Sequence, residues 1–140
     1  MTTETVRVVL VDDQESFRSA ARLVIGMAEG FELVSEAESG EEGLESLARF
    51  SVDLVLMDIV LPGIDGLEAT RRIVERDPKC TVIVLSTYEA SEYQSRALAA
   101  GAVAFVSKSD FDPDVLRGVW DAASLEDGDT DTHSRPGSDS

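Results

Sequence analysis

The stretch that decides the fold is Val6-Arg7-Val8-Val9-Leu10-Val11-Asp12-Asp13. Its first part is almost continuously apolar and rich in β-branched side chains, which is typical of a strand buried on both faces of a parallel sheet. The run ends abruptly in two acidic residues. Because sites in such sheets form beyond the carboxyl ends of the strands, this stretch predicts both a sheet and the edge at which a site would lie.

Four further segments share this character and lie at residues 31–37, 54–57, 81–85 and 103–106. Between the predicted strands, apolar residues recur at helical spacing; the first such series is Phe17, Ala21, Val24 and Ala28. Strict alternation of buried strands and amphipathic helices favours a parallel sheet with helices on both faces, because each crossover helix must pack back against the sheet. The predicted fold class is therefore α/β.

Several helices have recognisable start signals. Ser39 is followed by Glu42, as in a capping box, and Asp65 precedes another helical segment with an acid three residues later. Asp112 precedes Pro113, the order of an N-cap followed by proline at the first helical position. These signals predict helix starts at three places along the chain.

The composition excludes several classes of function. The chain has 28 Asp and Glu against 12 Lys and Arg, a formal net charge of -16, so we expect no direct binding of nucleic acid. Its single cysteine, Cys80, allows no intrachain disulfide and no Cys-based zinc site. Residues 1–5 lack the features of a signal peptide, and no apolar run approaches the ~20 residues of a membrane span. We therefore expect a cytoplasmic protein without membrane contact.

The composition also changes along the chain. Residues 1–125 are predicted to form one domain, because 43% of the chain is hydrophobic and can supply a single core. Residues 126–140 are built of Asp, Ser, Thr, Gly and other polar residues. Such a segment cannot bury enough apolar surface to offset its ordering entropy, which predicts an acidic disordered tail.

Acidic side chains follow two of the predicted strands. Asp12 and Asp13 come directly after the first strand, and Asp58 follows the third. If the strand order is 2-1-3-4-5, these strands are neighbours and the three carboxylates converge. Clustered carboxylates need a compensating cation, and carboxylate, carbonyl and water oxygens are the ligands that Mg2+ prefers. The sequence therefore predicts a magnesium site at this edge.

Two other polar residues are expected at the same edge. Lys108 follows the fifth strand, and Ser86 ends the fourth. Taken singly, an acid after a strand is more often a helix cap or a turn residue, and a lone Lys or Ser there is usually solvated. Their joint occurrence at matching strand ends favours a functional site.

These residues together resemble the CheY-like receiver domains of two-component response regulators, over residues 5–124. The motifs that carry the resemblance are Val9-Leu10-Val11-Asp12-Asp13, Asp58 with Leu61-Pro62-Gly63-Ile64-Asp65-Gly66, Leu85-Ser86-Thr87, and Gly101-Ala102 through Phe105 to Lys108. The resemblance implies a doubly wound, flavodoxin-like sheet of five parallel strands in the order 2-1-3-4-5. It also implies a phosphoprotein of phosphorelay signal transduction.

The resemblance assigns roles to the residues at the edge. Asp58 would accept a phosphoryl group from a sensor histidine kinase or a phosphotransfer protein. Asp13 would ligate Mg2+, Asp12 would hold a metal-bound water or assist, and Asp58 and the backbone carbonyl of Val60 would complete the ligand set. Lys108 would pair with the phosphoryl oxygens. These roles agree with the demands of phosphoryl transfer, which needs in-line positioning, a divalent cation and fixed donors.

The resemblance further implies a signalling switch rather than an enzyme with a separate substrate. Ser86 would rotate towards the phosphoryl group, and Phe105 would act as the aromatic switch. These movements would change the surface of the fourth and fifth helices, and phosphorylation could produce a homodimer.

Some residues depart from the family pattern. Phe105 stands where the family often has Tyr, and Thr87 stands where a smaller residue is frequent and so narrows phosphoryl access. Val60 and Tyr88 flank the expected path of the hydrolytic water. We hypothesise that these bulky side chains slow the loss of the phosphoryl group.

Residues 85–98 resemble the branch of the family whose members usually carry a C-terminal helix-turn-helix. The chain is then either a stand-alone receiver or a fragment of a longer regulator.

Other classes of protein fit the sequence less well. An aspartyl-phosphate phosphatase would have an acid where Val60 stands, and the acids after the first strand would repel the phosphate of a flavin. A receiver domain that is never phosphorylated remains an alternative, because a complete set of site residues does not prove activity.

Overall fold

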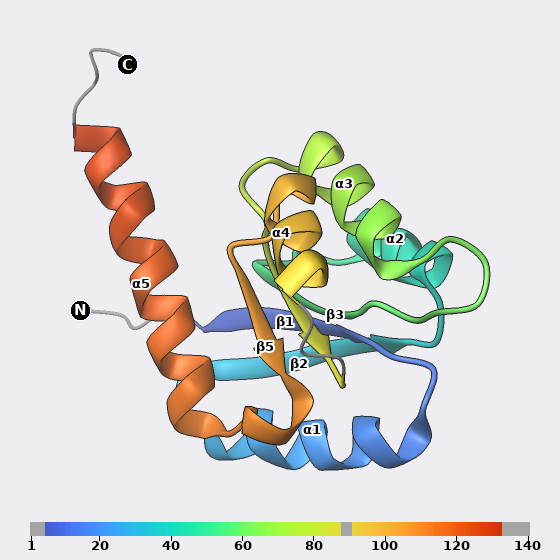
Figure 1. Ribbon diagram of the computed structural model, residues 1–140. Helices are drawn as coiled ribbons and strands as arrows, with labels where there is room; N and C mark the ends of the chain where they lie inside the picture. Colours follow the sequence, from blue (N-terminus) through green and yellow to red (C-terminus); the bar gives the residue numbers. More distant parts are fainter. Residues whose placement is uncertain (1–4, 88–90, 133–140) are drawn as a thin grey trace.

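The computed structural model describes residues 5–87 and 91–132 of the chain, which form a three-layer α/β structure (Figure 1). The sheet has five parallel strands in the order β2-β1-β3-β4-β5. The strands are β1 (Val6–Val11), β2 (Phe31–Ala37), β3 (Leu54–Asp58), β4 (Thr81–Ser86) and β5 (Ala104–Ser107). The predicted fold class and strand order are confirmed.

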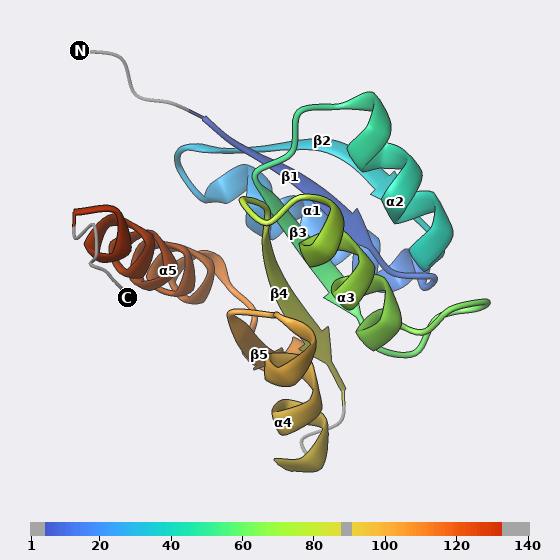
Figure 2. The same cartoon turned by 90° about the horizontal axis from the view of Figure 1, so that it is seen from above.

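Helices cover both faces of the sheet (Figures 1 and 2). On one face lie α1 (Glu15–Met27) and α5 (Pro113–Thr132), and on the other lie α2 (Gly40–Arg49), α3 (Gly66–Arg76) and α4 (Ser91–Ala100). A single 3-10 turn, η1 (Lys108–Asp110), joins β5 to α5. The reversal of strand order therefore falls between β1 and β3, where the sequence places its acidic residues.

The sheet separates two hydrophobic cores. Val8 and Leu10 of β1 face α1 and α5, where Ile25 and Leu116 are buried with them. Alternate residues of the same strand face α2, α3 and α4 and pack with Ile73 and other apolar side chains there. The central strands are thus buried on both sides, which explains why their sequences are continuously apolar rather than alternating.

The predicted helix starts are confirmed by side-chain caps. The amide of Glu42 donates to Ser39 Oγ over 3.1 Å, and the amide of Glu68 donates to Asp65 Oδ1 over 2.9 Å. Asp112 Oδ1 accepts from Val115 over 2.8 Å. The capping box at α2 differs in one detail, because the carboxylate of Glu42 accepts from the amide of residue 38 rather than from that of Ser39 itself.

The boundaries differ from the predicted ones at a few points. β3 and β4 each include their terminal polar residue, Asp58 and Ser86, and β5 begins one residue later than predicted. α5 continues past Leu125 to Thr132, because extending an existing helix adds a backbone hydrogen bond for each residue fixed. Residues 133–140 of the expected tail lie outside the described residues. Across the described ranges, no helix is long and apolar enough to cross a membrane.

Candidate functional site

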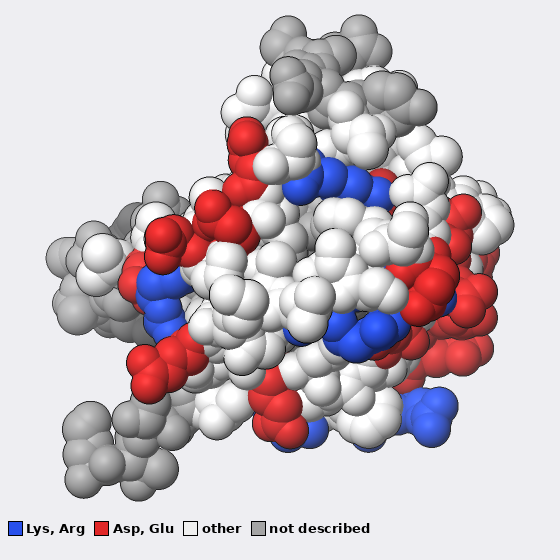
Figure 3. Space-filling model, turned by 90° about the horizontal axis from the view of Figure 1, so that it is seen from below, with Lys and Arg blue, Asp and Glu red and all other residues white. Residues whose placement is uncertain are grey.

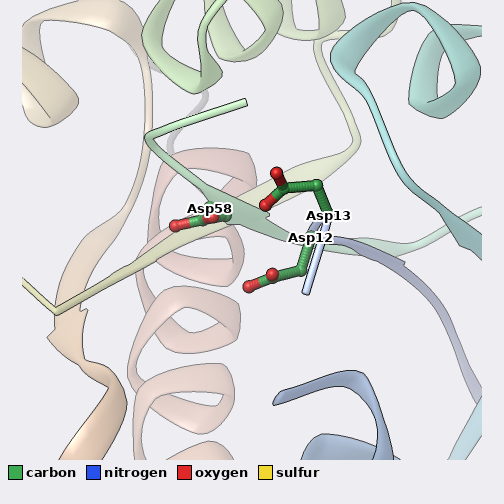
Figure 4. A group of neighbouring side chains, drawn as sticks. All are labelled: Asp12, Asp13 and Asp58. Carbon is green, nitrogen blue, oxygen red and sulfur yellow. The ribbon is translucent and has the colours of Figure 1, made fainter. Parts of the chain in front are cut away.

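Three carboxylates meet at the carboxyl ends of β1 and β3. One oxygen each of Asp12, Asp13 and Asp58 lies within 4.8 Å of the others, and the three side chains lie next to one another at the ends of the two strands (Figure 4). Asp12 and Asp58 are buried, with 1% and 7% of their surface exposed, while Asp13 is exposed. A buried pair with an exposed third member forms an anionic site that a cation from solvent can reach.

A small pocket opens over these carboxylates. It has a volume of about 160 Å³ and is lined by Asp13, Gln14, Asp58, Val60, Thr87 and Lys108. Thus most residues that the sequence predicts for the site lie around one hollow. The pocket combines carboxylates, one ammonium and three uncharged side chains, a lining suited to a small, charged, polar group rather than to an apolar ligand.

Lys108 supplies the positive charge of the site. Its Nζ lies 2.6 Å from Asp12 Oδ2 and 3.5 Å from Asp58 Oδ1, and the side chain is 8% exposed. The ammonium also lies 4.5 Å from the centre of the Phe17 ring on α1, close enough for a cation–π contact. These contacts hold the ammonium between the two buried carboxylates.

The two oxygens of Asp12 differ in their environment. Oδ1 accepts from the amide of Gln14 over 2.8 Å, which fixes the turn that follows β1. Oδ2 is buried and, within the described part of the chain, receives no hydrogen bond. The contact between Asp12 Oδ2 and Lys108 Nζ is therefore an ion pair whose angles do not meet those of a hydrogen bond. An anionic oxygen with unused acceptor capacity fits a site for an additional cation.

The ionisation of Asp58 reflects this crowding. Burial and the negative charge of Asp12 raise the pKa of Asp58 from 3.8 to about 6, although Lys108 acts in the opposite direction. One ammonium therefore does not compensate fully for the clustered carboxylates. A divalent cation would do so, and the residues present fit the ligand set that Mg2+ prefers.

The loop after β3 fixes the backbone of Asp58. Gly66, the first residue of α3, donates its amide to the carbonyl of Ile59 over 2.8 Å. A Cβ at Gly66 would lie 1.9 Å from the carbonyl oxygen of Asp58, so no larger residue fits there without movement of the backbone. Glu41 of α2 accepts from the amide of Ile64 over 3.2 Å and ties the middle of the loop to the neighbouring helix.

The other predicted residues lie around this centre at different depths. Ser86 is 1% exposed at the end of β4, while Thr87 is exposed and lines the pocket. Phe105 of β5 is half-buried and packs against the core that faces α2, α3 and α4. Tyr88 lies outside the described residues, so its predicted place beside the pocket stays a prediction.

Sequence reasoning missed Arg18, a buried arginine on α1 that donates to the carbonyl of Asp12 over 2.7 Å. A signal was available, because Arg18 lies on the inward face of α1 with the buried residues Ala21 and Ile25. Figure 3 views the molecule from below, the side on which α1 lies, and shows acidic side chains at several places on this face, most densely at one edge, with basic side chains among them.

The fold and the acidic pocket define a class of protein, and comparison with known proteins agrees with it. A sequence model of the response regulator receiver domain matches residues 8–120. The chain belongs to this family. The predicted recognition as a CheY-like receiver of two-component systems is thereby confirmed.

Individual relatives support the same assignment. The transcriptional regulatory protein DegU of Brevibacillus brevis is 34% identical over 111 residues, which are 79% of this chain and 47% of that protein. The response regulator GacA of Pseudomonas viridiflava is 36% identical over 103 residues, 74% of this chain and 48% of that protein. The chain thus spans about half the length of the curated relatives that it matches.

Solved structures are also similar. A LuxR-family two-component response regulator from Aurantimonas has a TM-score of 0.78 and 32% identity, with 86% of this chain and 85% of that chain covered. A signal receiver domain from Mycobacterium tuberculosis has a TM-score of 0.79 and 27% identity, with 86% and 98% covered. The LuxR-family and transcriptional relatives agree with the branch of the family that the sequence predicts.

Proposed function

We propose that this receiver domain accepts a phosphoryl group on Asp58 in a Mg2+-dependent reaction and thereby switches a surface that controls a partner or an output domain. The observation that carries the proposal is the convergence of three carboxylates and Lys108 on one pocket. Structural ion-pair networks also group charges. In this site the carboxyl group with the raised pKa lies beside an open pocket, and a phosphoryl acceptor requires such access.

Asp58 is the best placed of the three carboxylates to act as the nucleophile. It ends β3 at the pocket, and the loop that follows holds its backbone. A carboxylate can attack phosphorus without a general base. An oxygen of Asp58 forms a bond to the phosphorus of a phosphohistidine, the phosphorus–nitrogen bond breaks, and the released imidazole nitrogen takes up a proton. The product is an acyl phosphate on Asp58 and an unmodified histidine on the kinase or phosphotransfer protein.

Asp12, Asp13, Asp58 and the backbone carbonyl of Val60 would hold Mg2+. The bound ion would supply positive charge against the phosphoryl oxygens. The unused acceptor capacity of Asp12 Oδ2 and the exposure of Asp13 support this ligand set. Asp12 would assist mainly by orienting the ion and its water, because it is almost fully buried.

Lys108 and Ser86 would bind the phosphoryl oxygens. The Lys108 ammonium lies between Asp12 and Asp58, so a small movement would bring it to a group attached to Asp58. Ser86 ends the neighbouring strand β4 beside the end of β3. Phe105, in the next strand, would then change its packing and alter the surface formed by α4 and α5.

The partners and the location of the protein follow from the same proposal. A sensor histidine kinase or a phosphotransfer protein would donate the phosphoryl group, and phosphorylation would favour a homodimer or contact with an output domain in the cytoplasm. The transcriptional regulatory protein DegU, of which the matched residues make up 47%, supports an output linked to gene control. The net charge of -16 argues against DNA contact through this chain itself.

The lifetime of the phosphorylated state would be set by residues at the rim of the pocket. Val60 is 56% exposed and lines the pocket with Thr87, so both residues can obstruct a water that approaches Asp58. An acid at the position of Val60 would instead suit a phosphatase, which makes that alternative class less favourable. Dephosphorylation of Val60→Asn should be faster than that of the wild type, and equal or slower loss would contradict this part of the proposal.

The decisive experiment is incubation with Mg2+ and a small-molecule phosphodonor, followed by intact mass measurement. The wild type should gain the mass of one phosphoryl group, and Asp58→Asn should not. Asp65→Asn is the matched control, because it removes one acid from the adjacent loop while an Asn can still cap α3. No gain on the wild type, or an equal gain on Asp58→Asn, would refute phosphorylation at Asp58.

A further inference from the structure

Arg18 connects the acidic pocket to two other parts of the molecule. Its side chain is 10% exposed, although α1 lies at the surface. Nη1 donates to the carbonyl oxygen of Asp12 over 2.7 Å, and Nη2 donates to Glu15 Oε1 over 2.6 Å. Nε lies 3.2 Å from Glu36 Oε1, and Nη2 lies 3.6 Å from Glu38 Oε2. The guanidinium thus contacts the end of β1, the first turn of α1 and the end of β2.

The contact with Asp12 acts on the backbone rather than on a carboxylate. The carbonyl oxygen that Arg18 binds belongs to the peptide group between Asp12 and Asp13, so its direction also sets the directions of these two side chains. The amide of Asp12 is held from the other side by the carbonyl of Ala37 over 3.0 Å. The amide of Gln14 binds Asp12 Oδ1 over 2.8 Å and fixes the turn beyond. Arg18 therefore completes the set of bonds that orient this turn.

The acids around Arg18 hold the guanidinium in place. Glu15 and Glu38 have side chains 63% and 67% exposed, and that of Glu36 is 26% exposed, so they can accept the planar donors of the arginine without full burial. A guanidinium has donors in fixed directions and can serve a carbonyl and carboxylates together. The ammonium of a lysine is a compact charge on a shorter side chain, and it cannot bind a carbonyl and several carboxylates together at the same distances.

We propose that Arg18 is a positioning residue for the divalent cation of the acidic pocket, acting through the Asp12 carbonyl. This inference rests on the proposed Mg2+ dependence of the receiver. Arg18 orients the peptide between Asp12 and Asp13, so that both carboxylates are directed to the ion before it binds. Groups that orient metal ligands from behind raise metal affinity, typically by about 10- to 100-fold.

The direction in which Mg2+ affinity changes after loss of Arg18 distinguishes positioning from simple electrostatics. The positive charge of Arg18 repels a cation, and its removal also releases Glu15, Glu36 and Glu38 to attract one. Electrostatics alone therefore makes Mg2+ bind more tightly after loss of Arg18. Positioning makes Mg2+ bind more weakly.

Arg22 offers a matched control. It lies one turn further along α1 and shares two partners with Arg18, since it pairs with Glu36 over 2.6 Å and with Glu15 over 3.3 Å. Its side chain is 43% exposed, and its contacts are with these acids rather than with the Asp12 backbone. Replacing it by glutamine removes the same charge from the same network and leaves the Asp12 carbonyl bound.

The test is calorimetric titration of the full chain with Mg2+, supported by amide hydrogen exchange without metal. Arg18→Gln and Arg18→Lys should both bind Mg2+ about tenfold more weakly than the wild type, or weaker still. Arg22→Gln should bind as tightly or more tightly. The amide of Gln14 should exchange faster in both Arg18 variants and at the wild-type rate in Arg22→Gln.

Arg18→Lys keeps the buried positive charge and thus provides a folded variant if Arg18→Gln does not fold. Wild-type or tighter Mg2+ affinity in Arg18→Lys, with unchanged exchange at Gln14, would overturn the proposal. Equal weakening in Arg22→Gln would also overturn it. A wild type that binds Mg2+ but takes up no phosphoryl group would refute phosphorylation and leave the role of Arg18 standing. A wild type that binds no Mg2+ would refute the metal site and the role of Arg18 with it.

Discussion

Replacing Asp58 by Asn should stabilise the protein in the absence of a divalent cation. The pKa of Asp58 is raised from 3.8 to about 6, mainly by burial and then by the charge of Asp12. Its ionised form is therefore less favourable in the folded state than in the unfolded state, and stability falls as the pH rises through this interval. The difference corresponds to about 3 kcal/mol at a pH well above 6.

Asn has almost the shape of Asp and no charge, so it should recover most of this free energy at about pH 8. At about pH 5 the native Asp58 is mostly protonated and the unfolded one mostly ionised, and the gain should be roughly half as large. Urea unfolding with a chelator present measures both values. Glu45→Gln on α2 is the control for net charge, because Glu45 is exposed and lies in the middle of the helix, away from the charged first turn.

The stabilisation should disappear when Mg2+ is present in excess, because the ion stabilises only the folded wild type that can bind it. An Asp58→Asn variant that is no more stable than the wild type near pH 8 would refute the reasoning. A gain that does not change between pH 5 and pH 8, or that Glu45→Gln reproduces, would show that the ionisation of Asp58 is not its origin.

Three further predictions concern the same edge of the sheet. Mg2+ should bind more weakly as the pH falls through about 6, because a proton competes for Asp58, and a pH-independent affinity in calorimetric titration would contradict this. Gly66→Ala should lower the free energy of unfolding by about 2 kcal/mol or more, since its Cβ would collide with the Asp58 carbonyl; unchanged urea unfolding would be the contrary result. Asp65→Ala should cost about 1 kcal/mol in the same assay and Asp65→Asn almost nothing, and equal effects would argue against the cap.

Most of the fold could be predicted from the sequence because local and long-range requirements agree there. The central strands are continuously apolar, and they are buried on both faces of the sheet. Asp65 and Asp112 cap helices in the structure as their neighbours in the sequence suggest. The end of α5 was not predictable from composition, because a polar segment can continue a helix whose first turns are already packed.

The main residues of the site could be predicted from the sequence, but the contacts that hold them in place could not. The sequence points to Asp12, Asp13, Asp58 and Lys108 because each lies at the end of a strand or within two residues after it, and strand ends meet at one edge. The helical spacing of Arg18 with Ala21 and Ile25 could have indicated its inward position, but its hydrogen bond to a backbone carbonyl depends on side-chain geometry across three segments. Glu41 was missed for the same reason, as it binds a loop 23 residues away in the chain. Such contacts have no fixed spacing in a sequence.

The division of the interior by the sheet has a consequence for how this domain can change over evolutionary time. The core under α1 and α5 and the core under α2, α3 and α4 share no side chains, although they share the strands. Distant substitutions without common neighbours usually have additive effects. Substitutions in one core can therefore accumulate independently of those in the other core, with little need for compensating substitutions there. The carboxyl ends of the strands have no such freedom, because residues from both halves meet there.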